Sequence, residues 1–134
     1  MIKYMLDTDI CSYIMRERPI QVLKRFDTLK MDQFCLSIVT YAEFIYGIQR
    51  STNPEKHQSV VDQFITHVDV LSWNRSAAEH YGQIRADLGA QGNTIGNMDM
   101  MIAAHARSQD MVLVTNNEKH FQRVFALTIE NWMK

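Results

Sequence analysis

Short apolar runs alternate along this chain with longer segments in which apolar residues recur every three or four positions. The short runs are bounded by turn-forming or polar residues, which is typical of buried strands. The predicted strands cover residues 2–6, 34–39, 68–73, 111–115 and 126–131. The last of these is the weakest run, and we expect it at an edge of the sheet.

The intervening segments predict helices. Their apolar residues fall on one stripe, as on the segment after Pro54, where Val60, Val61, Phe64 and Ile65 align. The predicted helices cover residues 10–18, 19–29, 40–51, 54–67, 74–90, 98–108 and 118–124. Pro19 and Pro54 fit the first turns of their helices, where a missing N–H costs nothing. The glycine-containing segment 91–97 is predicted to be a loop.

Strands therefore alternate with helices from one end of the chain to the other. This order predicts an α/β fold of three α/β/α layers, with a central and mostly parallel sheet of about five strands. A length of 134 residues favours one domain that spans residues 1–134. In such sheets the ligand site lies beyond the carboxyl ends of the strands, where the strand order reverses.

Composition narrows the class only a little. The chain has 14 Lys and Arg against 15 Asp and Glu, and its formal net charge is -1. This overall charge does not indicate a nucleic-acid partner. The two cysteines, Cys11 and Cys35, lie in apolar surroundings without zinc-ligand spacing, and we interpret them as reduced core residues. No signal peptide or membrane span is visible, so we expect a cytoplasmic protein without membrane contact.

Acids and amides gather at the strand ends. Asp7 and Asp9 follow the first strand, and Glu43 lies near the start of the helix after the second. Asp99 begins the helix that leads into the fourth strand, and Asn117 follows that strand. In a parallel sheet these groups share one edge. Mutually repelling carboxylates are stabilised by a divalent cation, and oxygen ligands suit Mg²⁺ or Mn²⁺. Metal-assisted hydrolysis of a phosphodiester is the chemistry that this set favours.

Each acid also has a purely structural explanation. Thr40 to Glu43 matches a capping box, and Asp9 suits the N-cap of a helix that starts at Ile10. Asp99 suits the positive end of its helix dipole, and Asn117 suits a cap. Asp7 fits such explanations least well, because it ends a buried strand and needs a compensating charge.

The same residues resemble the successive motifs of the PIN-domain family, and most of all its VapC-type toxin ribonucleases. The resemblance is carried by "MLDTDICSYI", "SIVTYAEFIYGI", "GQIRADLGAQGNTIGNMDMMIAAHA" and "LVTNNEKHF", in order, from about Met5 to Trp132. It implies a PIN fold, Mg²⁺- or Mn²⁺-dependent endoribonuclease activity that inhibits translation and growth, and neutralisation by a cognate VapB-type antitoxin. Similarity to enteric members also implies initiator tRNA as the substrate, cut in the anticodon stem-loop.

The resemblance assigns roles residue by residue. Asp7, Glu43 and Asp99 match the three acids of the family, and Asn117 matches its fourth, usually acidic, position. On this basis all four are predicted to be catalytic, with Asp7 and Asp99 as metal ligands. Asn117 departs from the acidic pattern, and Asp9 stands where the family usually has Asn. Asp9 either restores the missing charge or caps the helix, and capping is the favoured alternative.

Other residues are assigned supporting roles. Thr115 and Arg85 are candidates for contacts with water or phosphate, as is Lys119, although an exposed helix arginine is more often simply solvated. The apolar helix at residues 41–48 suggests a groove for an antitoxin helix and a nearby homodimer surface. The competing function is a non-catalytic α/β binding module whose acids cap helices or hold a structural metal.

Overall fold

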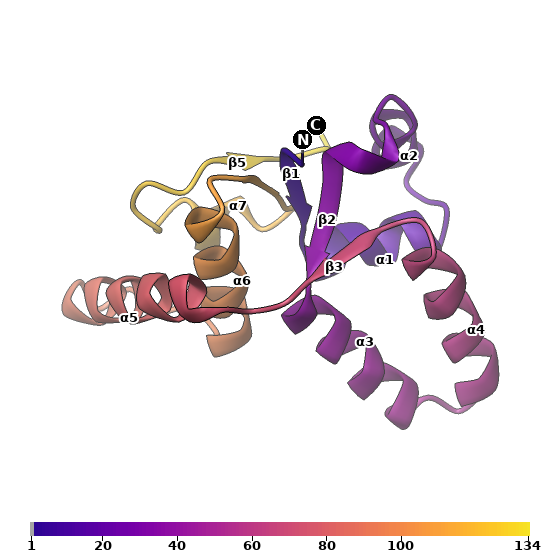
Figure 1. Cartoon of the computed structure of the whole chain (residues 1–134), viewed down its shortest axis with the longest axis horizontal. Helices are drawn as coiled ribbons and strands as arrows, with labels where there is room; N and C mark the ends of the chain where they lie inside the picture. The colour runs from indigo at the N-terminus through magenta and orange to yellow at the C-terminus, as the bar shows by residue number, and fades with distance from the viewer. Residues whose placement is uncertain (1) are drawn as a thin grey trace.

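A five-stranded parallel sheet forms the centre of the molecule (Figure 1). The structure, a computed structural model, describes residues 2–134. The strands are β1 (Tyr4–Leu6), β2 (Phe34–Ser37), β3 (Asp69–Leu71), β4 (Val112–Val114) and β5 (Ile129–Glu130). Their order across the sheet is β3-β2-β1-β4-β5, and every neighbouring pair is parallel. The predicted sheet is thus confirmed, with β5 at an edge.

Seven α-helices and one short 3-10 turn occupy the rest of the described chain. The helices are α1 (Thr8–Met15), α2 (Ile20–Asp27), α3 (Ile38–Arg50), α4 (Pro54–Ile65), α5 (Arg75–Ala90), α6 (Asn97–Ser108) and α7 (Glu118–Phe121), and the 3-10 turn is Met31–Gln33. Each predicted helix is present. Pro54 occupies the first turn of α4 as expected, whereas Pro19 is the N-cap of α2 rather than a residue of its first turn.

The second strand is shorter than predicted, because Ile38 and Val39 belong to α3. Their β-branched side chains favour strands, which is why the apolar run looked continuous. The side chain of Ser37, however, accepts a hydrogen bond from the Val39 N–H at 3.0 Å and starts the helix there. The fifth strand is also shorter than predicted, and Ala126, inside the predicted range, has a left-handed φ of 63°.

Two apolar cores cover the two faces of the sheet, which makes the three predicted layers. Alternate strand residues point to opposite faces. Tyr4 and Leu6 of β1 pack with residues from α1 to α4, while Met5 packs with residues from α5, α6 and α7. The α5–α6 pair lies on one side of the sheet and α1 to α4 lie on the other (Figure 1).

The strand order reverses at β1, which lies between β2 and β4. The chain moves from β1 outward to β2 and β3, then returns to the other side of β1 for β4 and β5. The first residues after β1 and β4, Asp7 and Thr115, therefore flank the reversal point, and the Asp7 N–H bonds to the Val114 carbonyl at 3.0 Å. This edge is where a doubly wound sheet places its ligand site.

Two further expectations concern the cysteines and the membrane. Cys11 and Cys35 are buried and free, as predicted. Within residues 2–134 no helix is both long and apolar enough to cross a membrane.

Candidate active site

Asp7 lies at the junction of β1 and α1, with only 5% of its surface exposed. It is the N-cap of α1, and its Oδ1 accepts a hydrogen bond from the Ile10 N–H at 3.0 Å. The prediction that Asp9 caps this helix is therefore wrong. Helix α1 begins at Thr8 rather than Ile10, because the extended backbone of Asp7 brings its own side chain over the first turn. Asp9 sits exposed within that turn.

Burial gives Asp7 an unusual titration. Loss of solvation raises the pKa of its carboxyl group from 3.8 to about 7, although hydrogen bonds from the Thr115 side chain and the Ile10 N–H oppose the rise. The neighbouring charges that act on it, from Asp9 and Asp99, are both negative and raise the pKa further. The residue thus sits where added positive charge would stabilise its ionised form.

Glu43 reaches the same region from α3. The predicted capping box from Thr40 to Glu43 does not form, because Ser37 caps the helix three residues earlier and places Thr40 inside it. The Thr8 hydroxyl instead donates to Glu43 Oε1 at 2.6 Å, and it lies 3.3 Å from the Thr40 hydroxyl. Burial raises the pKa of Glu43, the bond from Thr8 lowers it, and the charges of Asp99 and Asp9 raise it.

Asp99 lies in the first turn of α6, as predicted, and faces His120 of α7. Its Oδ2 is 3.8 Å from His120 Nδ1. Burial raises the pKa of Asp99, the charge of His120 opposes this, and Asp9 raises it again. Sequence reasoning did not assign His120 to the site. The sequence feature that could have identified His120 is its position one helical turn after Asn117 in "TNNEKH".

Thr115 and Asn117 follow β4 at the same edge. The Asn117 N–H donates to the Thr115 hydroxyl at 2.9 Å, and the Asn117 amide lies 2.8 Å from His120 Nδ1. Asn117 occupies the N-cap position of α7 but makes no side-chain cap bond, so its side chain is used for His120 instead. The structure thus links Asn117 to Asp99 through this histidine.

Arg85 and Lys119 are both exposed. The Arg85 guanidinium donates to the Tyr81 hydroxyl at 2.8 Å, and that hydroxyl lies 3.4 Å from Oδ1 of Asn97 at the start of α6. Arg85 is therefore near the N-terminus of α6, the helix that carries Asp99. Lys119 belongs to α7, directly before His120.

Asp9 connects the cluster electrostatically, since its charge raises the pKa values of Asp7, Glu43 and Asp99. Among residues 2–134 no three His, Cys, Asp or Glu side chains are close enough to enclose a metal ion. The donors are oxygens held apart at an open edge, which fits an ion that keeps several waters and takes one or two carboxylates, as Mg²⁺ does. It does not fit a closed zinc site.

The sequence matches the family model described as "PIN domain" over residues 4–126. It is 45% identical over 132 residues to the "tRNA(fMet)-specific endonuclease VapC" of Shigella flexneri, covering 98% of this chain and 99% of that one. It is 43% identical over 133 residues to "Ribonuclease VapC2" of Haemophilus influenzae, covering 99% of this chain and 100% of the relative.

Solved structures resemble the fold equally well. A DNA-bound VapBC structure from Salmonella typhimurium contains a chain that superposes with a TM-score of 0.93 at 41% identity, covering 98% of this chain and 99% of that one. VapBC-1 from nontypeable Haemophilus influenzae gives a TM-score of 0.91 at 40% identity, with 100% of both chains covered.

Proposed function

This chain belongs to the PIN domain family and to its VapC ribonucleases, and from that premise we propose that it cuts initiator tRNA with the aid of a divalent metal ion. The observation that carries the reaction is the convergence of Asp7, Glu43 and Asp99 at the sheet edge, each with a raised pKa. Burial is the main cause for all three, and the charge of Asp99 raises the pKa of Asp7 and of Glu43 further. Partly or fully buried carboxylates without a full counter-charge are typical of a site that holds a cation.

Asp7 and Asp99 would hold the ion, Mg²⁺ or Mn²⁺, and Glu43 would complete the acidic set. When bound, the ion supplies positive charge that polarises the phosphodiester and favours ionisation of a water molecule. The bond from Thr8 orients Glu43 so that its free carboxylate oxygen can position the attacking water and accept its proton. Thr115 holds Asp7 in place, and Asn117 and His120 lie where they can contact water or phosphate.

The substrate follows from the relatives. The Shigella flexneri and Salmonella typhimurium relatives, at 45% and 42% identity, are both named tRNA(fMet)-specific endonucleases. A chain this similar over its whole length is expected to share that RNA class. Arg85 and Lys119, both exposed near the acids, are candidates for contacts with its phosphates.

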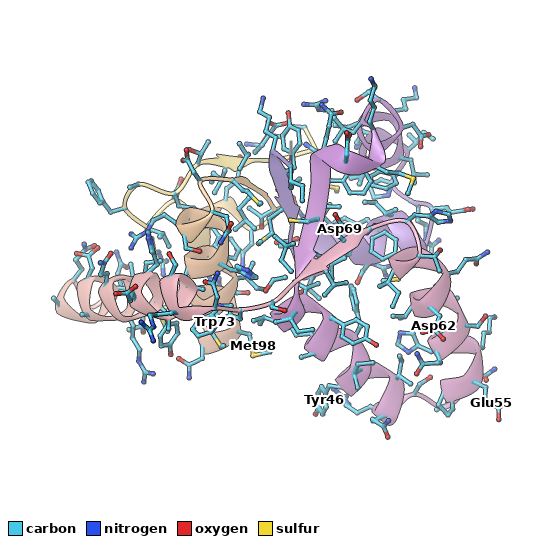
Figure 2. The ribbon with its side chains drawn as sticks, in the orientation of Figure 1. Tyr46, Glu55, Asp62, Asp69, Trp73 and Met98 are labelled. Atoms are coloured by element: carbon cyan, nitrogen blue, oxygen red, sulfur yellow. The ribbon has the colours of Figure 1, made fainter. Side chains whose placement is uncertain are left out.

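The partner is proposed on the same basis. The solved relatives are VapBC structures, so we expect a VapB-type antitoxin to bind this chain. The homodimer is proposed from the family resemblance. Helix α3 offers surface for such contacts. Phe44 and Ile48 are buried against the core, whereas Tyr46 is 64% exposed and projects outward from the helix (Figure 2).

The test is cleavage of purified initiator tRNA, beside total RNA, with Mg²⁺ or Mn²⁺ added after chelation. We expect the wild-type chain to cut and Asp7→Asn and Asp99→Asn to lose activity. Asp62→Asn is the matched control, because Asp62 is an exposed acid on α4 and lies away from the acidic edge (Figure 2). Cleavage that persists in both active-site variants would overturn the site. Absence of cleavage by wild type under all metal conditions would favour the binding module.

A further inference from the structure

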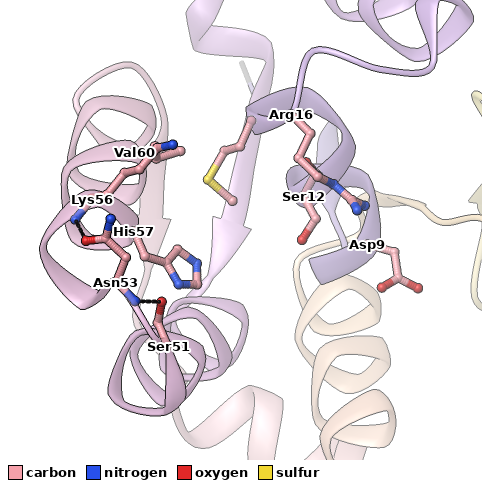
Figure 3. Close-up of a pocket in the computed structure, with 9 residues that line it drawn as sticks. Asp9, Ser12, Arg16, Ser51, Asn53, Lys56, His57 and Val60 are labelled. Carbon is pink, nitrogen blue, oxygen red and sulfur yellow. Dashed lines mark hydrogen bonds between the residues drawn. The ribbon is translucent and has the colours of Figure 1, made fainter.

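A cleft of about 540 Å³ opens between α1 and α4, next to the acidic edge (Figure 3). On one side it is lined by Asp9, Ser12 and Arg16, which are spaced three and four residues apart and so share one face of α1. On the other side it is lined by Lys56 and His57 of α4. The two walls are built from segments that lie about forty residues apart in the sequence.

The charge in this cleft is mainly positive. Arg16 and Lys56 are both exposed, and neither forms an ion pair with any other residue of the described chain. Asp9 is the one acid among the lining residues. Ser12 and His57 add polar groups that can donate hydrogen bonds. Such a set suits an anion whose oxygens accept from both walls.

Arg16 is also held in place before any ligand arrives. Its Nε donates to the Ser12 carbonyl at 3.3 Å, and its guanidinium lies over the Tyr13 ring at 5.4 Å from the centroid. A guanidinium fixed in this way loses less freedom when it binds phosphate than a free side chain would.

The cleft adjoins the acidic site at Asp9. Asp9 lines the cleft and lies in the first turn of α1, two residues after Asp7, which is the N-cap of that helix. The proposed metal ion acts on the phosphodiester that is cut, and a neighbouring source of positive charge strengthens the binding of the adjoining phosphates. The overall charge of -1 does not provide it, whereas Arg16 and Lys56 do so locally.

We propose that the α1–α4 cleft binds a backbone phosphate of the RNA beside the bond that is cut, through Arg16 and Lys56. This inference rests on the proposed ribonuclease function and names residues that position its substrate. A peptide segment of a protein partner is the competing occupant, since Met15 and Val60 add apolar surface. The two cations, one on each wall, and the position of Asp9 between the cleft and Asp7 favour the phosphate.

The test compares Arg16→Gln/Lys56→Gln with the matched control Lys3→Gln/Lys24→Gln. The control removes the same charge from two exposed lysines that do not line the cleft. We expect the cleft variant to raise KM for initiator tRNA about tenfold, the usual scale for losing charge-assisted hydrogen bonds, with kcat unchanged. The slope of log KM against log salt concentration should fall by about 0.7, since the cleft is proposed to hold one phosphate and each single-strand phosphate contact contributes about 0.7. The control should change neither quantity.

Binding is measured separately from cleavage. The same substitutions are placed in the Asp7→Asn background, and the Kd for uncut tRNA is determined by fluorescence anisotropy. We expect the cleft variant to bind about ten times more weakly than the control. This measurement tests the cleft even if wild-type protein cuts no RNA, so the two proposals can fail independently.

Two outcomes would overturn the inference. One is cleavage that depends on Asp7 while the cleft variant keeps the KM, Kd and salt slope of the control. The other is a cleft variant that binds RNA normally but loses affinity for a purified VapB-type antitoxin, which would assign the cleft to the protein partner.

Discussion

Arg25 and Glu130 pair their charges on the α2 side of the sheet, whereas Asp7, Glu43 and Asp99 lie along its carboxyl edge. The Arg25 guanidinium lies 2.9 Å from Glu130, and it also contacts the Tyr4 hydroxyl and the faces of the Tyr4 and Trp132 rings. Among residues 2–134, the ion pair that involves this acidic set is the one between Asp99 and the His120 imidazole, at 3.8 Å, and it requires a protonated ring.

The two regions differ in what their charges do to stability. Burial works to lower the pKa of Arg25, but its hydrogen bonds to Glu130 and Tyr4 outweigh this and the pKa is raised. The carboxyl pKa values at the sheet edge are raised as well, which for an acid means that its charged form is disfavoured in the fold. The first region therefore stabilises its charges, and the second retains charges at a cost to stability, as functional sites often do.

Asp7→Asn should show the largest effect. Loss of a residue that only hydrogen-bonds a metal ligand already reduces metal affinity or activity about 10- to 100-fold. Loss of a proposed ligand itself should therefore reduce kcat/KM at least about a hundredfold. The amide keeps the cap bond to Ile10, because its oxygen can still accept. Glu130→Gln, the control from the other region, should keep full activity. Cleavage assays on purified tRNA measure both.

Two results would contradict this contrast between the two regions. Full activity in Asp7→Asn would show that the buried acid is only a helix cap. Loss of activity in Glu130→Gln, with the fold retained by circular dichroism, would extend the site to the α2 side.

Stability should depend on pH through Asp7. Its pKa is about 7 in the fold against 3.8 in the reference state, so the folded chain binds more protons than the unfolded chain between these values. The contribution of Asp7 to the free energy of unfolding should consequently be greatest near pH 4 and should fall as pH rises toward 7. The loss is at most about 4 kcal/mol. Urea denaturation of wild type and Asp7→Asn across this range measures it.

Asp7→Asn should lack this part of the pH dependence, so the two stability curves converge at low pH and separate near pH 7. Adding Mg²⁺ or Mn²⁺ should narrow the gap, because a bound cation stabilises the charged carboxylate. Parallel curves at every pH would contradict the assignment of the raised pKa to Asp7.

Much of the fold was predictable because its elements follow local rules. Apolar runs and turn residues predict all five strands, and the parallel order predicts Asp7, Glu43 and Asp99 at one edge. What the pattern could not settle were choices between neighbouring residues. Asp7 rather than Asp9 caps α1, and Ser37 rather than Thr40 starts α3, because helix starts depend on backbone angles that adjacent polar residues leave open.

The missing parts of the site depend on tertiary approach. The bond from Thr8 to Glu43 requires α1 and α3 to come together, and these residues are 35 positions apart. His120 faces Asp99 only because α7 packs beside the start of α6. No sequence pattern predicts either contact. The acids at the strand ends are different, because the apolar runs before them predict where the strands end.

Glu130→Gln should have a moderate effect on stability. Glu130 accepts from both Arg25 and the Trp132 indole, each at 2.9 Å, but about a third of its side chain is exposed. Solvent screening limits such a pair, so the free energy of unfolding should fall by about 1 kcal/mol. A double-mutant cycle with Arg25→Gln separates the pair from the stacking of Arg25 on the rings. A coupling energy of zero would show that only the stacking matters.

Lys134→Gln should have the smallest effect, although its ion pair is the shortest. Lys134 Nζ lies 2.7 Å from Glu118, closer than Arg25 lies to Glu130, and the hydrogen bond from Lys134 lowers the pKa of Glu118. Its side chain is 72% exposed, however, so water and salt compete for both charges. We expect no measurable change in the unfolding midpoint at physiological salt. A loss as large as that of Glu130→Gln would mean that distance rather than burial sets the value of these pairs, and it would remove the physical basis for contrasting a stabilising region with the acidic edge.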